Sequence, residues 1–196
     1  QRVAEQYVTV LNDDTYVVGT NNYRRAETVL LGGDDGYHGG FRFFYIQIPQ
    51  GATINRAFIS LTAAEGSYKE MNLKIYAHDV DDSPNFQDPL LVPDRARTDH
   101  YVTWNFLRSE GWVPGRVYTS PDLSDVVQEV IDRPDWQERN ALSFLFIADP
   151  GDNLPREAWA ADGSFEDRAY LKIYFTQETG APTPAPTRTP TPIPTH

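Results

Sequence analysis

The sequence predicts an all-β fold: a jelly-roll-like β-sandwich with one short α-helix and an extended C-terminal tail rich in Pro and Thr. Three observations support this prediction. Short segments alternate between apolar and polar residues, those segments are rich in aromatic and β-branched residues, and loops rich in Gly, Pro and Asp separate them. No internal repeat is present, which argues against a solenoid or a propeller.

The strands are predicted from this alternation, because successive side chains of a strand point to opposite faces of the sheet. In NLKIYAHDV, for example, Leu73, Ile75 and Ala77 share one face. The predicted strands are residues 6–11, 28–33, 40–49, 57–63, 72–80, 100–104, 141–148, 157–161 and 169–176.

A single segment, SPDLSDVVQEVIDRP, predicts a helix. Ser120 is the expected N-cap, Pro121 occupies the first helical position and Pro134 ends the helix. The apolar stripe consists of Leu123, Val126, Val127, Val130 and Ile131. This helix is expected to cover one mouth of the sandwich.

The chain is expected to form one sandwich domain over residues 1–178, followed by a Pro/Thr-rich tail over residues 179–196. Residues 1–11 are a candidate for a strand that pairs with, or is exchanged with, a neighbouring molecule. The tail has almost no side chain suited to a core. A polyproline II chain rises about 3.1 Å per residue, so sixteen residues of the tail can reach roughly 50 Å.

Composition excludes several classes of function. The net charge of −11 disfavours nucleic acid as a partner, and the absence of cysteine excludes disulfides, zinc–thiolate sites and cysteine nucleophiles. No apolar run has the length of a membrane span, so membrane insertion is not expected. The chain begins with Gln, and we expect an exported protein at the cell surface or outside the cell, after removal of a signal peptide.

Six motifs follow one another along the chain: LNDDTYV (11–17), TVLLGG (28–33), FRFFYIQIPQGATINRAFISL (41–61), VTWNFLRSEGWVPG (102–115), TSPDLSDVVQEVIDRPDW (119–136) and FEDRAYLKIYF (165–175). In this order they resemble the bacterial surface modules called DNRLRE domains, which are related to a family of alginate-binding carbohydrate modules. The resemblance implies a secreted, non-catalytic sandwich, often next to a Pro/Thr linker.

The sequence also lacks the motifs of common enzymes. Its four histidines show no metal-ligand spacing, and no nucleophile elbow is present. The loop GGDDGYHGG lacks the G-K-[ST] ending of a phosphate-binding loop. A glycoside hydrolase needs two carboxylates across a cleft, and nothing in the sequence singles out such a pair. We therefore expect no catalytic activity.

Calcium is the metal that the sequence predicts, and solvated acidic loops are the alternative explanation. HDVDDSPNFQD offers oxygen ligands at alternating positions but lacks the Gly and the terminal acid of an EF-hand. Segments 12–16 and 161–167 are expected to meet, since the first and last strands of jelly rolls often pair. The candidate ligands are Asp13, Asp14, Asp79, Asp81, Asp162 and Asp167; no other cofactor is expected.

Two functions from different classes remain. The first is a structural subunit that assembles head-to-tail into a filament or layer, with copies of itself as partners. Its candidate contacts are Tyr7, Val8 and Val10 near the N-terminus and Pro184, Pro186, Pro190, Pro192 and Ile193 in the tail. Tail threonines beside prolines are expected to be O-glycosylated, namely Thr183, Thr187, Thr189, Thr191 and Thr195.

The alternative function is a polysaccharide-binding or adhesive module, with the tail as a linker. Trp112 and Trp136 are its candidate stacking platforms. Both lie in the motifs that carry the family resemblance, so the competing interpretation is that they pack in the core.

Overall fold

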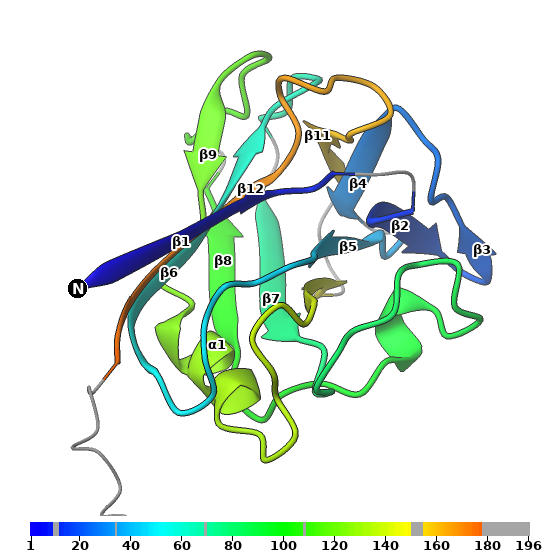
Figure 1. Ribbon diagram of the computed structural model, residues 1–196. Helices are drawn as coiled ribbons and strands as arrows, with labels where there is room; N and C mark the ends of the chain where they lie inside the picture. The colour runs from blue at the N-terminus through cyan, green and yellow to red at the C-terminus, as the bar shows by residue number, and fades with distance from the viewer. Residues whose placement is uncertain (10–11, 34, 69, 108, 150–154, 178–196) are drawn as a thin grey trace, which may run out of the picture.

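The computed structural model describes residues 1–9, 12–33, 35–68, 70–107, 109–149 and 155–177, and over these residues the protein is the predicted all-β sandwich (Figure 1). The strands are β1 (Arg2–Tyr7), β2 (Asp14–Val18), β3 (Asn21–Asn22), β4 (Thr28–Gly32), β5 (His38–Phe43), β6 (Thr53–Thr62), β7 (Met71–Ala77), β8 (Val102–Phe106), β9 (Val117–Thr119), β10 (Leu142–Ala148), β11 (Pro155–Trp159) and β12 (Tyr170–Thr176).

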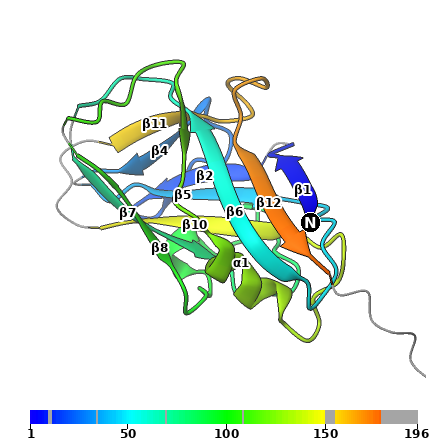
Figure 2. The ribbon, with the colours of Figure 1, turned by 90° about the vertical axis from the view of Figure 1, so that its left-hand side faces the viewer.

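Two antiparallel sheets form the layers of the sandwich. The four-stranded sheet has the order β1-β12-β6-β9, and the six-stranded sheet has the order β3-β2-β5-β10-β7-β8. A ribbon of β11 and β4 lies at one end, and helix α1 (Ser124–Ile131) lies at the other (Figures 1 and 2). The first and last of the described strands pair, from Arg2 opposite Phe175 to Tyr7 opposite Tyr170.

The core lies between the two sheets. Phe41 and Phe146 point inward from the six-stranded sheet and meet edge to face, with ring centroids 5.2 Å apart. Ile59 and Ile173 point inward from the four-stranded sheet and are fully buried in the same cluster. Helix α1 buries its apolar stripe against β6 and β7, one strand from each sheet, so it covers an end of the sandwich as predicted.

The helix begins later than predicted, at Ser124, and Ser120 is not its cap. Ser120 is buried beside β6, where its Oγ accepts a hydrogen bond from the N–H of Ile59 at 3.1 Å. The Asp122 carboxylate accepts hydrogen bonds from the N–H groups of Ala57 and Ser124. Residues 120–123 therefore extend along β6 before the chain turns into the helix. The sequence pattern does not show whether these residues form the first turn of the helix or lie along a strand.

Several predicted strands have different bounds in the structure; β6, for example, begins at Thr53 instead of residue 57. The first predicted strand runs over residues 2–7 instead of 6–11. The predicted strand 40–49 stops at Phe43, because Tyr45 adopts a left-handed backbone with φ of 65° and turns the chain away. Strands β2, β3 and β9 are not among the predicted ones.

The outer faces of the two sheets are covered differently. The connection from β7 to β8, which contains a 3-10 turn at Val92–Asp94, lies over the six-stranded sheet and buries Phe86 against Gly40. Buried Arg95 lies over the Phe86 ring at 4.6 Å and donates hydrogen bonds to the carbonyls of Pro84 and Asn85. The four-stranded sheet keeps exposed side chains on its outer face, such as Val3 (48% exposed) and Val117 (57%).

Candidate functional site

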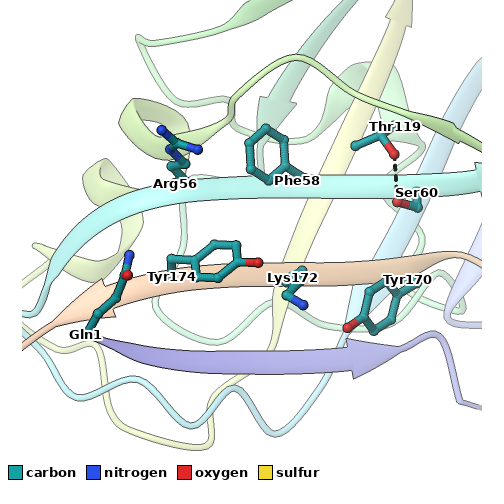
Figure 3. A pocket seen from close by; sticks show the side chains of 8 residues that line it. All are labelled: Gln1, Arg56, Phe58, Ser60, Thr119, Tyr170, Lys172 and Tyr174. Carbon is teal, nitrogen blue, oxygen red and sulfur yellow. Dashed lines mark hydrogen bonds between the residues drawn. The ribbon is translucent and has the colours of Figure 1, made fainter.

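A shallow groove of about 600 Å³ runs over the outer face of the four-stranded sheet (Figure 3). Its lining comes from β12, β6, β9 and the first residue of the chain. The lining residues are Gln1, Arg56, Phe58, Ser60, Thr119, Tyr170, Lys172 and Tyr174. The groove therefore combines aromatic rings, two cations and several hydroxyl groups on one open surface.

Strand alternation explains why these side chains point outward. In β12, Leu171 and Ile173 are buried in the core, and the residues between and beside them face the groove. These outward residues are Tyr170, Lys172 and Tyr174. In β6 the same alternation turns Arg56, Phe58 and Ser60 outward.

The strand register arranges the lining in rows. It places Tyr174 opposite Arg56, Lys172 opposite Phe58, Tyr170 opposite Ser60 and Ser60 opposite Thr119. The hydroxyls of Ser60 and Thr119 lie 3.1 Å apart and share a hydrogen bond. Since strands are about 4.8 Å apart and successive outward residues about 7 Å apart, each row brings polar and aromatic groups within reach of one ligand unit.

One acidic residue, Glu5 on β1, borders the groove. Its carboxylate accepts a hydrogen bond from Lys172 Nζ at 2.8 Å and another from the Tyr170 hydroxyl. The bonds from Lys172 and Tyr170 lower the pKa of Glu5, and the bond to Glu5 raises the pKa of Lys172. Burial, reinforced by Glu5, raises the pKa of Tyr170 to about 12, so the phenol stays protonated and donates its hydrogen bond.

Next to the Tyr170 end of the groove, a further cation lies among aromatic rings. Arg168 lies two residues before Tyr170, and its guanidinium stacks on Phe165 at 3.5 Å and on Tyr7 at 4.6 Å. Tyr7 in turn packs on Tyr170, with ring centroids 4.6 Å apart. The outward positions 168, 170, 172 and 174 are thus Arg, Tyr, Lys and Tyr. They form a row of cations and aromatic rings on the surface, although the net charge of the chain is −11.

The groove can bind a ligand by stacking and hydrogen bonding. Among the described residues that line it, none is acidic, so the lining does not supply the pair of carboxylates that glycoside hydrolysis needs. None of these lining residues is among the site residues predicted from the sequence. A signal was present in the alternation RAYLKIY, but the sequence does not show which of two sheet faces is open.

Both tryptophans that were predicted to stack on sugars are buried. Trp112 is 0% exposed and its Nε1 donates a hydrogen bond to the Glu157 carbonyl at 2.7 Å. Trp136 is 2% exposed and its Nε1 donates a hydrogen bond to the Ile48 carbonyl at 2.9 Å. The stacking role predicted for them is therefore wrong, because their rings are covered by the protein, and packing is their role.

The candidate calcium ligands Asp79 and Asp81 both form ion pairs with Arg133, from the chain just after α1. Asp167 accepts a hydrogen bond from the Ser164 hydroxyl at 2.8 Å. These residues do not join the other candidates in one site. Each has a partner from the protein itself.

The segments that carry the remaining candidate ligands, residues 12–16 and 161–167, do meet, as expected. Asp14 Oδ2 accepts a hydrogen bond from the Ala161 N–H at 2.7 Å. Burial raises the pKa of Asp14 to about 7. The hydrogen bond from Ala161 lowers this pKa, and the negative charges of Asp162 and Asp13 raise it further. Asp13 forms a 2.8 Å ion pair with Arg42. Calcium binding stays a prediction: in the described part of the chain, no three His, Cys, Asp or Glu side chains are grouped to hold a metal ion.

The residues predicted to mediate assembly fall in three places. Tyr7 is 42% exposed on the open face. Val8 is fully buried in the core of its own sandwich, so its predicted contact with a neighbour is wrong for this arrangement. Val10, the tail prolines, Ile193 and the candidate O-glycosylated threonines lie outside the described residues.

No protein-family model matches the chain, and the search of curated proteins found no similar sequence. The resemblance to DNRLRE domains therefore remains an expectation from the motifs. Within the residues that the structure describes, no helix has the length and apolar character needed to cross a membrane.

Proposed function

We propose that the protein is a non-catalytic polysaccharide-binding module whose ligand lies along the groove of the four-stranded sheet. The observation that supports this function is the combination of Phe58, Tyr170 and Tyr174 with two cations on one open sheet face. The expected setting is outside the cell, where polysaccharides are abundant.

The chemistry of the groove suits a sugar chain. The apolar face of a sugar ring stacks on an aromatic side chain, while hydroxyls such as those of Ser60 and Thr119 can bond its rim. The groove is shallow and open along the strands, which favours a segment of an extended chain over an enclosed small molecule. Arg56 and Lys172 further favour sugars that carry carboxylate or sulfate groups.

The experiment is a titration of the protein with a panel of soluble neutral and acidic polysaccharides, followed by calorimetry. Tyr174→Ala removes one ring of the groove and should weaken binding about tenfold or more, equal to about 1.4 kcal/mol. Tyr101→Ala is the matched control, because Tyr101 is an exposed tyrosine (47%) next to Tyr76 of the other sheet. Its affinity should equal that of the unchanged protein.

Two results would contradict the proposal. One is the absence of binding to every polysaccharide on the panel by a folded protein. The other is equal weakening by Tyr174→Ala and Tyr101→Ala, since that would place the ligand away from the groove.

A further inference from the structure

We propose that β1 exchanges between two copies of the chain, so that Arg2–Tyr7 of one copy pairs with β12 of the other. The partner is a second copy of this chain, and the contact is the one seen within a single copy. Only the consequence for the groove, given below, rests on the proposed function.

Strand β1 is weakly anchored in its own domain. It is the edge strand of the four-stranded sheet, and among the described residues no strand pairs with its other edge. Its inward side chains Ala4 and Gln6 are only half-buried, whereas Val8, just after the strand, is fully buried. The Gln6 side chain reaches the Tyr45 carbonyl at a long 3.4 Å.

Packing beneath β1 is also incomplete. A cavity of about 100 Å³ lies between β1, the segment Tyr45–Gln47 and the β12 residues Leu171 and Ile173. The cavity is partly open to solvent, and the side chains beside it lack some of the dispersion contacts that a closely packed interior provides. The strand is thus held mainly by its ladder with β12 and by outward contacts.

All of those contacts can be remade with a strand from another copy. The ladder, the ion pair of Glu5 with Lys172 and the packing of Tyr7 on Tyr170 join residues 2–7 to β12. A β12 edge without β1 presents unpaired N–H and C=O groups, which template an incoming strand. The β1 of a second copy has the one sequence already matched to that edge, which is the condition for domain swapping.

Exchange would make the groove a shared site. Gln1 lines the groove and Glu5 bonds Lys172, so in an exchanged pair these two residues come from the partner copy. Reciprocal exchange closes a dimer, whereas exchange in one direction builds a chain of copies. The head-to-tail assembly was predicted to use both the N-terminal segment and the tail. Exchange of β1 would provide the contact made by the N-terminal segment.

The absence of cysteine makes a disulfide test clean. Val3 and Tyr174 are directly opposite in the β1–β12 ladder, a spacing that a disulfide can bridge. Val3→Cys/Tyr174→Cys is therefore the test variant. Arg56→Cys/Tyr174→Cys is the matched control, because Arg56 faces Tyr174 from β6 and stays in the same copy after exchange. Val3→Cys alone is a second control, because any disulfide that it forms comes from random contact between two molecules.

Each variant is refolded at increasing concentration, oxidised and run on a non-reducing gel. The expected result is a disulfide-linked dimer, or a ladder of larger species, that grows with concentration in the test variant while the control pair stays monomeric. A disulfide that forms only within monomers of the test variant, at every concentration, would overturn the proposal. Equal dimer formation in the control pair or in Val3→Cys alone would overturn it as well.

The outcome is separable from the polysaccharide proposal. If the unchanged protein binds polysaccharide and the test variant never cross-links between copies, exchange is wrong and the module stands. If the test variant cross-links between copies but the unchanged protein binds no polysaccharide, exchange stands and the module is wrong.

Discussion

Lys172 on the last described strand donates a hydrogen bond to Glu5 on the first, over 2.8 Å. Both side chains are partly exposed, at 36% and 49%, so the pair adds little to stability. Its effect is on the groove, because Glu5 partly neutralises one of the two cations of the lining. The charge of the candidate site is thus set jointly by both ends of the sandwich domain.

Glu5→Gln should strengthen the binding of acidic polysaccharides by about threefold, because it frees the charge of Lys172 while keeping the shape of residue 5. The gain should shrink at high salt, where exposed charges are screened. Calorimetric titrations at low and high ionic strength measure both effects. A neutral polysaccharide that binds is the control and should show no gain. Equal or weaker binding of the acidic polysaccharide at low salt would contradict the charge argument.

Asp14→Asn should remove a pH dependence of stability. The pKa of Asp14 is raised to about 7 in the folded protein, against about 3.9 in an unfolded chain, so the folded state binds the extra proton between these values. The stability associated with protonated Asp14 is therefore present below pH 4 and is lost as the pH rises through 7. Asn keeps an acceptor for the Ala161 N–H.

The measurement is urea unfolding of both proteins at pH 8 and at pH 4.5. At pH 8 the variant should be more stable by up to about 4 kcal/mol, which is the linkage value of a three-unit shift. At pH 4.5 most of that difference should vanish. A difference of the same size at both pH values would show that Asp14 acts through its shape and not through its charge.

Arg95→Met should lower the free energy of unfolding by about 3 kcal/mol. The substitution leaves the carbonyls of Pro84 and Asn85 without their donors and removes the cation from the Phe86 ring. Arg97→Met is the control, since Arg97 is exposed and its guanidinium lies over the Tyr76 ring at 5.3 Å. Thermal unfolding of both variants compares them. A similar loss in the two would mean that the connection over the six-stranded sheet does not depend on Arg95.

Gly163→Ala should destabilise the loop that carries Phe165. A Cβ at Gly163 would lie 2.0 Å from the Glu27 carbonyl oxygen, so the loop has to move. We expect a loss of about 2 kcal/mol in urea unfolding. Gly66→Ala is the matched change, because its Cβ would meet only ordinary contacts, the nearest at 3.6 Å. The interpretation fails if both variants are equally stable.

Much of the fold could be predicted from the sequence because strand alternation is a local property. The segments 57–63, 141–148 and 169–176 correspond to β6, β10 and β12, and the apolar stripe of the helix is the buried face of α1. The ends of elements were predicted less well. The left-handed backbone of Tyr45 ends β5, and the pairing of residues 120–123 with β6 delays the helix.

The candidate site could not be predicted from the sequence in this way. From the sequence, Trp112 and Trp136 were candidates both for stacking on sugars and for packing in the core, and the structure buries both. The alternation in β12 identifies two faces but not which of them meets solvent. That depends on the connection over the six-stranded sheet, which covers one outer face and leaves the other open.

The sequence by itself determined the all-β class, most of the strands, the position of the helix and the net charge of −11. Only the tertiary structure decided which aromatic rings are exposed, which acidic residues meet and which strand lies at the edge. The physical reason is the separation along the chain over which each kind of interaction acts. Alternation and capping act over a few residues, whereas burial and register depend on segments as distant as Glu5 and Lys172.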